Sequence, residues 1–204
     1  MKTEHIIRGL RVVVDNPYPN IETAFVLARL DAALGLIERF QPIRFRHLKR
    51  DAAYMWVARY ACRGAYFPAE RAILTEITFL NKPQEHPPAE VASSILHEGV
   101  HARLDRMAAR LGFARRWSAA DEERLCRRAE VRFGRALPAD IGDVVLRRVE
   151  PILEHASDEE VAPAIDWRVA RMRQLERDLQ DMAVPKWAHR PLLALARWRI
   201  GRLS

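Results

Sequence analysis

The sequence predicts a predominantly helical α+β fold, with a few strands before residue 80 and helices after it. Apolar side chains recur at helical spacing over residues 21–40 and again from residue 88 onward. Residues 72–80, rich in β-branched and aromatic side chains, alternate instead at the two-residue period of a strand. The 204 residues are 49% hydrophobic and 30% charged, which suits one soluble domain with a substantial core.

The first half of the chain contains one clear helical pattern and one clear strand pattern. Residues 21–40 carry an apolar stripe, and Pro42 is expected to end that helix. Residues 48–62 fit either a helix or a buried strand, and both alternatives stay open. The strand 72–80 belongs to a segment that Gly64 opens and Pro83 closes.

Two helices are predicted in the middle of the chain. The first begins near residue 88, because the prolines there are tolerated only at a helix start, and Gly112 is placed to cap its end. Ser118 and Asp121 form a capping signal for the second helix, which Pro138 ends. The pattern stays helical from residue 140 onward. Breaks are expected near Ser157, Pro163 and Pro185.

The composition excludes several classes of protein. The net charge is +7, but the arginines are interleaved with acidic residues and no nucleic-acid-binding motif is present, so we expect no nucleic-acid partner. Two cysteines, Cys62 and Cys126, are too few for a disulfide scaffold. Arg8 and Arg11 interrupt the N-terminal apolar run, so no secretory segment is expected there. We therefore predict a cytoplasmic protein.

The stretch SSILHEGVHARLD carries the pattern that predicts chemistry. His97 and His101 occupy positions i and i+4 of a predicted helix, so their imidazoles project from one face about 5–6 Å apart at Cβ. Two imidazoles at that spacing can bind one zinc ion. Glu98 is placed beside the metal-bound water, where a carboxylate acts as general base. The pattern predicts one zinc ion, with Glu98 as the catalytic residue.

A catalytic zinc site usually has three protein ligands. Met107 stands where a third histidine would continue the motif, so a three-histidine site of that kind is excluded. On the next predicted helix, Glu123 and Glu130 share a face, and Glu122 is expected to point elsewhere. We favour Glu123 as the third ligand, because it lies a short helical-hairpin distance past His101. Glu130 is the second candidate, either as a ligand or as a partner of one.

These residues resemble the zincin superfamily of zinc metallopeptidases, specifically the gluzincin type, in which an HExxH helix precedes a glutamate helix. The stretches HEGVHARL and EERLCRRAEVRFGRALP are also similar to small bacterial zincin-like proteins, over residues 70–138. The resemblance implies a minimal zincin-like metal-binding domain at residues 1–138 and a helical extension, residues 139–204, packed on it. It implies a zinc-dependent peptidase-like hydrolase whose peptide or protein substrate lies along strand 72–80 as an edge strand.

The chain departs from the thermolysin-like branch of that superfamily. Arg127 stands where an acidic residue would support a ligand histidine. Asp105, on the same helical face as His101, could take that role or form an ordinary surface ion pair. Cys126 shares the face of Glu123, where it either fills the core or binds and blocks the metal. The candidates for stabilising an oxyanion are Tyr54, Tyr66 and His155.

An alternative function is a zincin scaffold with little or no turnover, which docks a partner or a membrane surface through its basic helices. Residues 187–204, if helical, gather leucines and an isoleucine on one side, with arginines and two tryptophans around them. Such a helix either lies in a membrane interface or packs on the domain with its basic face outward. The sequence leaves the oligomeric state open.

Overall fold

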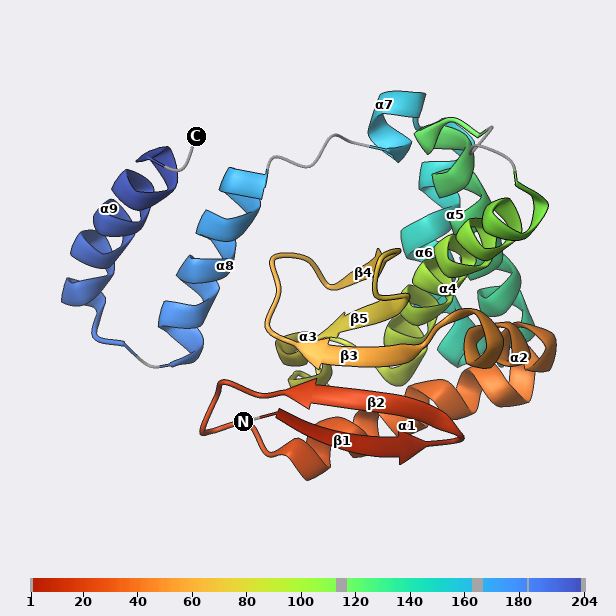
Figure 1. Ribbon diagram of the computed structural model, residues 1–204, viewed down its shortest axis with the longest axis horizontal. Helices are drawn as coiled ribbons and strands as arrows, with labels where there is room; N and C mark the ends of the chain where they lie inside the picture. The colour runs from red at the N-terminus through yellow and green to blue at the C-terminus, as the bar shows by residue number, and fades with distance from the viewer. Residues whose placement is uncertain (1, 113–116, 163–166, 183, 203–204) are drawn as a thin grey trace.

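Figure 1 shows a mixed β-sheet with helices packed around it in the computed structural model, which describes residues 2–112, 117–162, 167–182 and 184–202. Within these ranges the sheet has five strands in the order β1-β2-β3-β5-β4. β2, β3 and β5 run parallel, whereas β1 and β4 are antiparallel to their neighbours at the two edges. The strands are β1 Lys2–Ile7, β2 Leu10–Asp15, β3 Tyr54–Ala58, β4 Gly64–Phe67 and β5 Ala72–Glu76.

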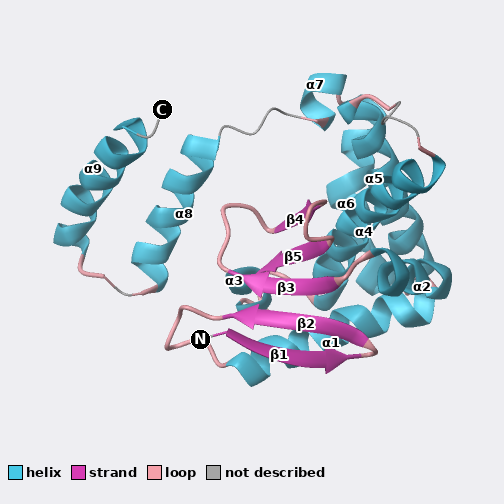
Figure 2. Cartoon of the chain, viewed as in Figure 1, coloured by secondary structure: helices cyan, strands magenta, loops and turns pink. Residues whose placement is uncertain are grey.

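Helices make up most of the remaining chain, and Figure 2 shows how the strands gather in one place among them. Their bounds are α1 Thr23–Phe40, α2 Pro42–Asp51, α3 Ile77–Asn81, α4 Pro88–Leu111, α5 Ala119–Ala136, α6 Ala139–His155, α7 Asp158–Val161, α8 Trp167–Asp181 and α9 Lys186–Arg202. The predicted α+β, predominantly helical class is therefore confirmed.

The core lies between the sheet and helices α1 and α4, which lie behind the sheet in Figure 1 and contact each other. Val57 and Ile73 of the strands share one buried cluster with Leu34 of α1 and Ile95 of α4. The period-2 side chains of the strands and the apolar stripes of the helices thus bury each other. This packing fixes α4 against β5 and β4.

The caps predicted from the sequence are present. Gly112 adopts the left-handed conformation, with φ of 65°, at the C-terminus of α4. Ser118 and Asp121 form a reciprocal capping box at the start of α5. The ambiguous segment 48–62 contains both alternatives, because α2 ends at Asp51 and β3 follows. Ser157 caps α7, and the predicted break near Pro163 lies outside the described residues.

The predicted strand 72–80 is too long, and its second half is wrong. β5 ends at Glu76, whose carboxylate Oε2 accepts hydrogen bonds from Thr78 Oγ1 (2.5 Å) and from the Phe79 amide (3.0 Å). Those bonds cap α3, so the apparent alternation continues into a helix. β5 also pairs with a strand on each side. The edge strand on this side of the sheet is therefore β4.

The C-terminal helices attach to the domain in two ways. α6 packs on α5 and α4, and its Val145 and Val149 belong to the core. α8 docks through buried Asp178, which accepts a hydrogen bond from Tyr18 Oη (2.5 Å) and pairs with Arg59. α9 packs on α8 and leaves Trp187 81% exposed.

The predicted amphipathic segment 187–204 corresponds to α9, whose side chains from residue 197 onward lie outside the described residues. Membrane contact through this segment stays a prediction. Among the described residues, none of the helices combines the length and the apolar character that a bilayer crossing requires.

Candidate metal centre

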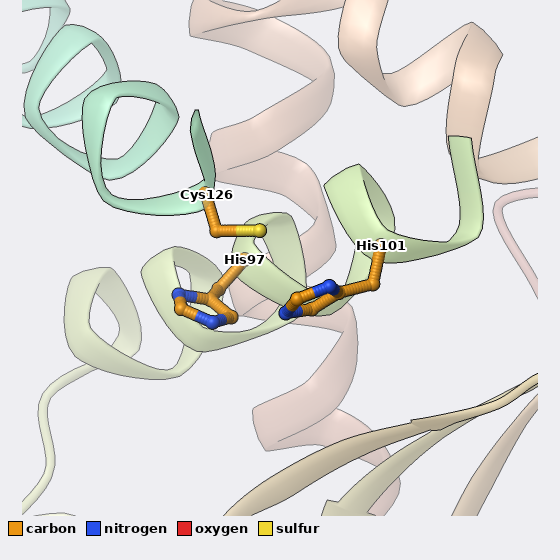
Figure 3. A group of neighbouring side chains, drawn as sticks. All are labelled: His97, His101 and Cys126. Carbon is orange, nitrogen blue, oxygen red and sulfur yellow. The ribbon is translucent and has the colours of Figure 1, made fainter. Parts of the chain in front are cut away.

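Helices α4 and α5 bring the predicted ligands to one place. Figure 3 shows His97 and His101 on α4 directed toward the space beside Cys126 of α5. Glu123, one turn before Cys126, contributes a carboxylate that faces both imidazoles. Its Oε2 lies 3.1 Å from His97 Nε2 and its Oε1 lies 3.2 Å from His101 Nε2. The helical hairpin expected between these residues is thus present.

The spacing of these donors fits a small tetrahedral cation. Zinc with ligands at about 2.0–2.1 Å places neighbouring donor atoms about 3.3 Å apart, close to the separations at Glu123. His97, His101 and Cys126 also have donor atoms within 4.8 Å of one another. The residues therefore offer three nitrogen and oxygen ligands and a thiol that lies close enough to be a fourth.

Glu130 supports His97 from the other side of its ring. Its carboxylate is 1% exposed, and Oε1 lies 2.8 Å from His97 Nδ1. Oε2 accepts hydrogen bonds from Ser93 Oγ (2.5 Å) and from Arg148 Nη2 (2.5 Å). Arg127, whose position would hold an acid in thermolysin-like proteins, instead lies 3.6 Å from Glu130 Oε1. A carboxylate–histidine pair of this kind fixes the ring orientation and leaves Nε2 available for a metal.

The Glu98 side chain lies close to Gly64 at the start of the edge strand. A Cβ atom added to Gly64, the first residue of β4, would lie 3.3 Å from Glu98 Oε1 and 2.9 Å from Ser94 Oγ. Only glycine therefore allows β4 to approach α4 this closely. The Glu98 carboxyl is thus close to β4, and it also interacts electrostatically with His97 and His101.

The pKa values of the cluster show how strongly its groups are coupled. Burial lowers the pKa of His97, but its hydrogen bonds with Glu123 and Glu130 outweigh burial and raise that pKa to about 10. Burial alone would raise the pKa of Glu123, yet its hydrogen bonds with the two histidines hold the pKa well below the usual range. Burial raises the pKa of Glu98, and the charges of His97 and His101 oppose this rise only in part.

The Cys126 thiol is buried among carboxylates. Burial raises its pKa, and the negative charges of Glu123, Glu98 and Glu130 raise it further. Without a metal the thiol is therefore neutral at physiological pH. Several buried acids next to two imidazoles form a site in which a cation would relieve the excess negative charge.

Two sequence predictions about neighbouring acids need revision or remain open. Glu122 does not point elsewhere, because it is buried and its Oε2 lies 3.8 Å from His101 Nδ1. Asp105 accepts a hydrogen bond from Tyr66 Oη (3.0 Å), which links α4 to β4. Its predicted support of His101 stays a prediction.

The three candidates for oxyanion stabilisation lie in different places. Tyr66, on β4, is the one whose hydroxyl reaches α4, through Asp105. Tyr54 lies at the start of β3 with Arg11 over its ring. His155, at the end of α6, is 79% exposed and lies near Glu154. The geometry therefore favours Tyr66.

Ser93 and Arg148 are parts of the site that the sequence did not disclose. Ser93 lies one turn before His97 on the same helical face, so its proximity was readable from the spacing, although its function was not. Arg148 comes from α6, which packs across α5 and α4, and no local pattern indicates that packing.

Comparison of the chain with protein-family models, with curated proteins and with solved structures found no match.

Proposed function

We propose that the protein is a zinc-dependent, peptidase-like hydrolase of the zincin type. The observation that carries this proposal is the position of Glu123. Its two oxygens face the Nε2 atoms of His97 and His101, while the neighbouring Glu98 lies against Gly64 of β4. A three-ligand set with a carboxylic acid beside it is the arrangement that hydrolytic metal sites use.

His97, His101 and Glu123 would hold the metal. When bound, zinc polarises a carbonyl group and makes a water molecule acidic enough to attack it. Glu130 holds Nδ1 of His97, so the Nε2 lone pair is directed at the metal position. Arg148 and Ser93 in turn hold Glu130. The site residues are therefore oriented before any ligand arrives.

Glu98 is the proton carrier. A general base works best when its pKa lies near the working pH, and burial moves the pKa of Glu98 upward in that direction. Its carboxylate accepts a proton from the attacking water and returns it to the leaving amine. Tyr66 donates its hydroxyl proton to Asp105, so it would have to release that bond before it could donate to the substrate oxygen.

The open edge of β4 supports an extended peptide as substrate. β4 pairs with β5 on one side and is the last strand of the sheet, and each of its four residues is half-buried. A peptide added as a further strand would lie along α4 and pass Glu98 near Gly64. We therefore propose that the substrate lies along β4 rather than along the interior strand β5.

The test is peptide hydrolysis by the zinc-loaded protein and by a Glu98→Gln variant. Glutamine has the same shape but cannot take the proton, so we expect turnover to fall by about 100-fold or more while zinc content stays unchanged. A mixture of short peptides of varied sequence, analysed by mass spectrometry, reveals cleavage at whichever bond the protein attacks. Equal turnover by both proteins would show that the activity does not arise at this site.

A second candidate function is a metal-holding scaffold without turnover. It is favoured by Cys126, whose Sγ lies within 4.8 Å of the histidine donor atoms. A thiolate in the fourth position would close the site to water. Cobalt substitution distinguishes the two candidates, because a thiolate ligand adds a charge-transfer band that Cys126→Ala would remove. If wild-type protein lacks this band and hydrolyses peptides, the result would favour the enzyme.

A further inference from the structure

A cavity lies beyond the start of β4, next to the candidate metal centre. Its volume is about 180 Å³, and it is bounded by the end of β5, by α3, by the loop before α4 and by Arg177 of α8. The lining side chains that are charged or can titrate are Cys62, Arg63, Glu76, Lys82, Glu85, His86 and Arg177. A cavity of this size holds a side chain or the end of a peptide rather than a folded partner.

The cavity contains a buried carboxylate with unused hydrogen-bonding capacity. Glu76 is 4% exposed, and its Oε2 accepts the bonds from Thr78 and Phe79 that cap α3. Its Oε1 is buried and has no hydrogen-bond partner among the described residues. An unpaired buried acceptor costs free energy, so its presence at a cavity indicates a donor that comes from outside the chain.

Three cations line the cavity, Arg63, Lys82 and Arg177, and the two arginines have partners elsewhere. Arg63 pairs with Glu90 (2.8 Å) and lies over the Phe79 ring. Arg177 donates hydrogen bonds to Gln174 Oε1 (2.7 Å) and to the Ala61 carbonyl oxygen (3.5 Å). Neither guanidinium group donates a hydrogen bond to Glu76 Oε1, although the positive charge of Arg177 acts on this carboxyl, so the oxygen remains an acceptor for a ligand.

Only a short segment separates the cavity from Glu98. Cys62 lines the cavity, and its Sγ donates to the carbonyl oxygen of Gly64 at 3.0 Å. Gly64 is the residue that contacts Glu98, and the amide of Glu76 donates to the Arg63 carbonyl oxygen at 2.9 Å. A peptide that lies along β4 therefore reaches this cavity immediately past Glu98.

We propose that this cavity binds a primary ammonium group of the substrate and that Glu76 is its recognition residue. The inference rests on the proposed function and deepens it, because it makes peptides with an ammonium group next to the cleaved bond the substrate class. The ammonium group can come from a peptide amino terminus or from a lysine side chain. Both donate N–H bonds to a carboxylate oxygen and carry the compensating charge.

The test measures binding rather than turnover, on full-length protein kept metal-free with a chelator. Three probes are titrated by calorimetry: alanyl-alaninamide, its N-acetyl derivative, and N-acetyl-alanyl-lysinamide. We expect the first or the third to bind and the acetylated dialanine to bind at least about tenfold more weakly. Whichever ammonium peptide binds identifies the source of the group.

Glu76→Gln is the matched variant. Its amide oxygen can keep the bonds from Thr78 and Phe79 while an NH₂ group replaces Oε1, so α3 stays capped and the ammonium is no longer accepted. We expect binding to weaken by about tenfold or more. Glu85→Gln, at another acid that lines the cavity, is the control and should change binding by less than about twofold.

Equal binding of an ammonium peptide to wild type and Glu76→Gln, or no preference of wild type for ammonium peptides, would overturn the proposal. A melting curve that matches wild type shows that Glu76→Gln is folded. Zinc titration of the same samples reports separately on His97 and His101. Failure of the cavity and failure of the metal site are therefore distinguishable.

Discussion

Two buried carboxylates, one in the metal centre and one in the cavity, have opposite surroundings. Glu130 is 1% exposed, and both of its oxygens are bonded, to His97 on one side and to Ser93 and Arg148 on the other. Glu76 is 4% exposed, and one of its oxygens has no partner among the described residues. Burial opposes ionisation in both, but His97 and Arg148 lower the pKa of Glu130, whereas the pKa of Glu76 stays raised.

The difference separates two uses of a buried acid. A fully bonded carboxylate holds other side chains in place, and its removal leaves their charges unpaired. A buried carboxylate with one oxygen that lacks a hydrogen-bond partner lowers the stability of the fold. That oxygen can, however, accept a hydrogen bond from a ligand. We therefore propose that Glu130 positions His97 for a metal and that Glu76 accepts a hydrogen bond from a ligand.

The largest effect is expected at Glu130. Glu130→Ala leaves Arg148 and His97 without their buried partner, so we expect a loss of about 3–5 kcal/mol in the free energy of unfolding. Zinc affinity should fall by about 10–100-fold, because His97 loses its orientation. Urea denaturation and competition with a chromogenic chelator measure the two effects. Unchanged zinc affinity in a folded Glu130→Gln protein would contradict the positioning role.

The next prediction concerns the contact between Gly64 of β4 and Glu98 of α4, which lies between the metal centre and the cavity. Gly64→Ala places a methyl group 2.9 Å from Ser94 Oγ, which must shift, and 3.3 Å from Glu98 Oε1, so the Glu98 carboxyl must give way slightly. We expect kcat/KM to fall by about 10–100-fold, since small displacements of a catalytic group carry costs of that size. Zinc content should stay at the wild-type value. Ala65→Gly, on the same strand, serves as the control, and an equal loss there would point to damage of β4 in general.

The stability effect at Glu76 should have the opposite sign to that at Glu130. A carboxyl whose folded pKa is raised destabilises the fold once the pH exceeds its unfolded value, about 4.5. Glu76→Gln removes that penalty, so we expect a gain of up to about 1 kcal/mol at pH 7 that disappears near pH 4. Denaturant titrations at both pH values measure it. A loss comparable to that of Glu130→Gln would abolish the distinction between the two acids.

The smallest effect is expected at Cys62, which lies between the regions. Burial first, and then the charges of Glu98 and Glu76, raise the pKa of its thiol to about 11. Alkylation by iodoacetamide at pH 8 should therefore be slow and should accelerate as the pH approaches that value. Glu98→Gln and Glu76→Gln each remove a negative charge, so each should speed alkylation a few-fold. Peptide mapping separates Cys62 from Cys126. An alkylation rate of Cys62 that is the same in wild type and in both variants would show that neither carboxylate acts on this thiol.

The parts of the structure that local chemistry determines were predictable. Gly112 at the end of α4 and the Ser118–Asp121 capping box of α5 satisfy helix termini with neighbouring residues, so they fix the hairpin that carries His97 and Glu123. The meeting of those two residues follows from helix spacing and a short connection.

The parts that depend on distant contacts were not predictable. The predicted strand 72–80 is too long because the alternation of side chains continues past Glu76, whereas the Glu76 side chain caps α3 and a helix begins there. The supporting role of Glu130 depends on Arg148 from a later helix. One side of the cavity is lined by Arg177. This residue donates a hydrogen bond to the carbonyl oxygen of Ala61, which is distant in the sequence. The periodic pattern of apolar residues in the sequence does not indicate such contacts.

The most direct test of the central claim is the metal content of the purified protein, prepared without chelator and titrated with zinc. We predict about one zinc per chain in wild type and in His155→Ala, whose histidine is exposed at the end of α6. It predicts none in His97→Ala/His101→Ala, measured on folded protein by elemental analysis. No zinc uptake by wild type, or equal uptake by the double variant, would contradict a metal centre between α4 and α5.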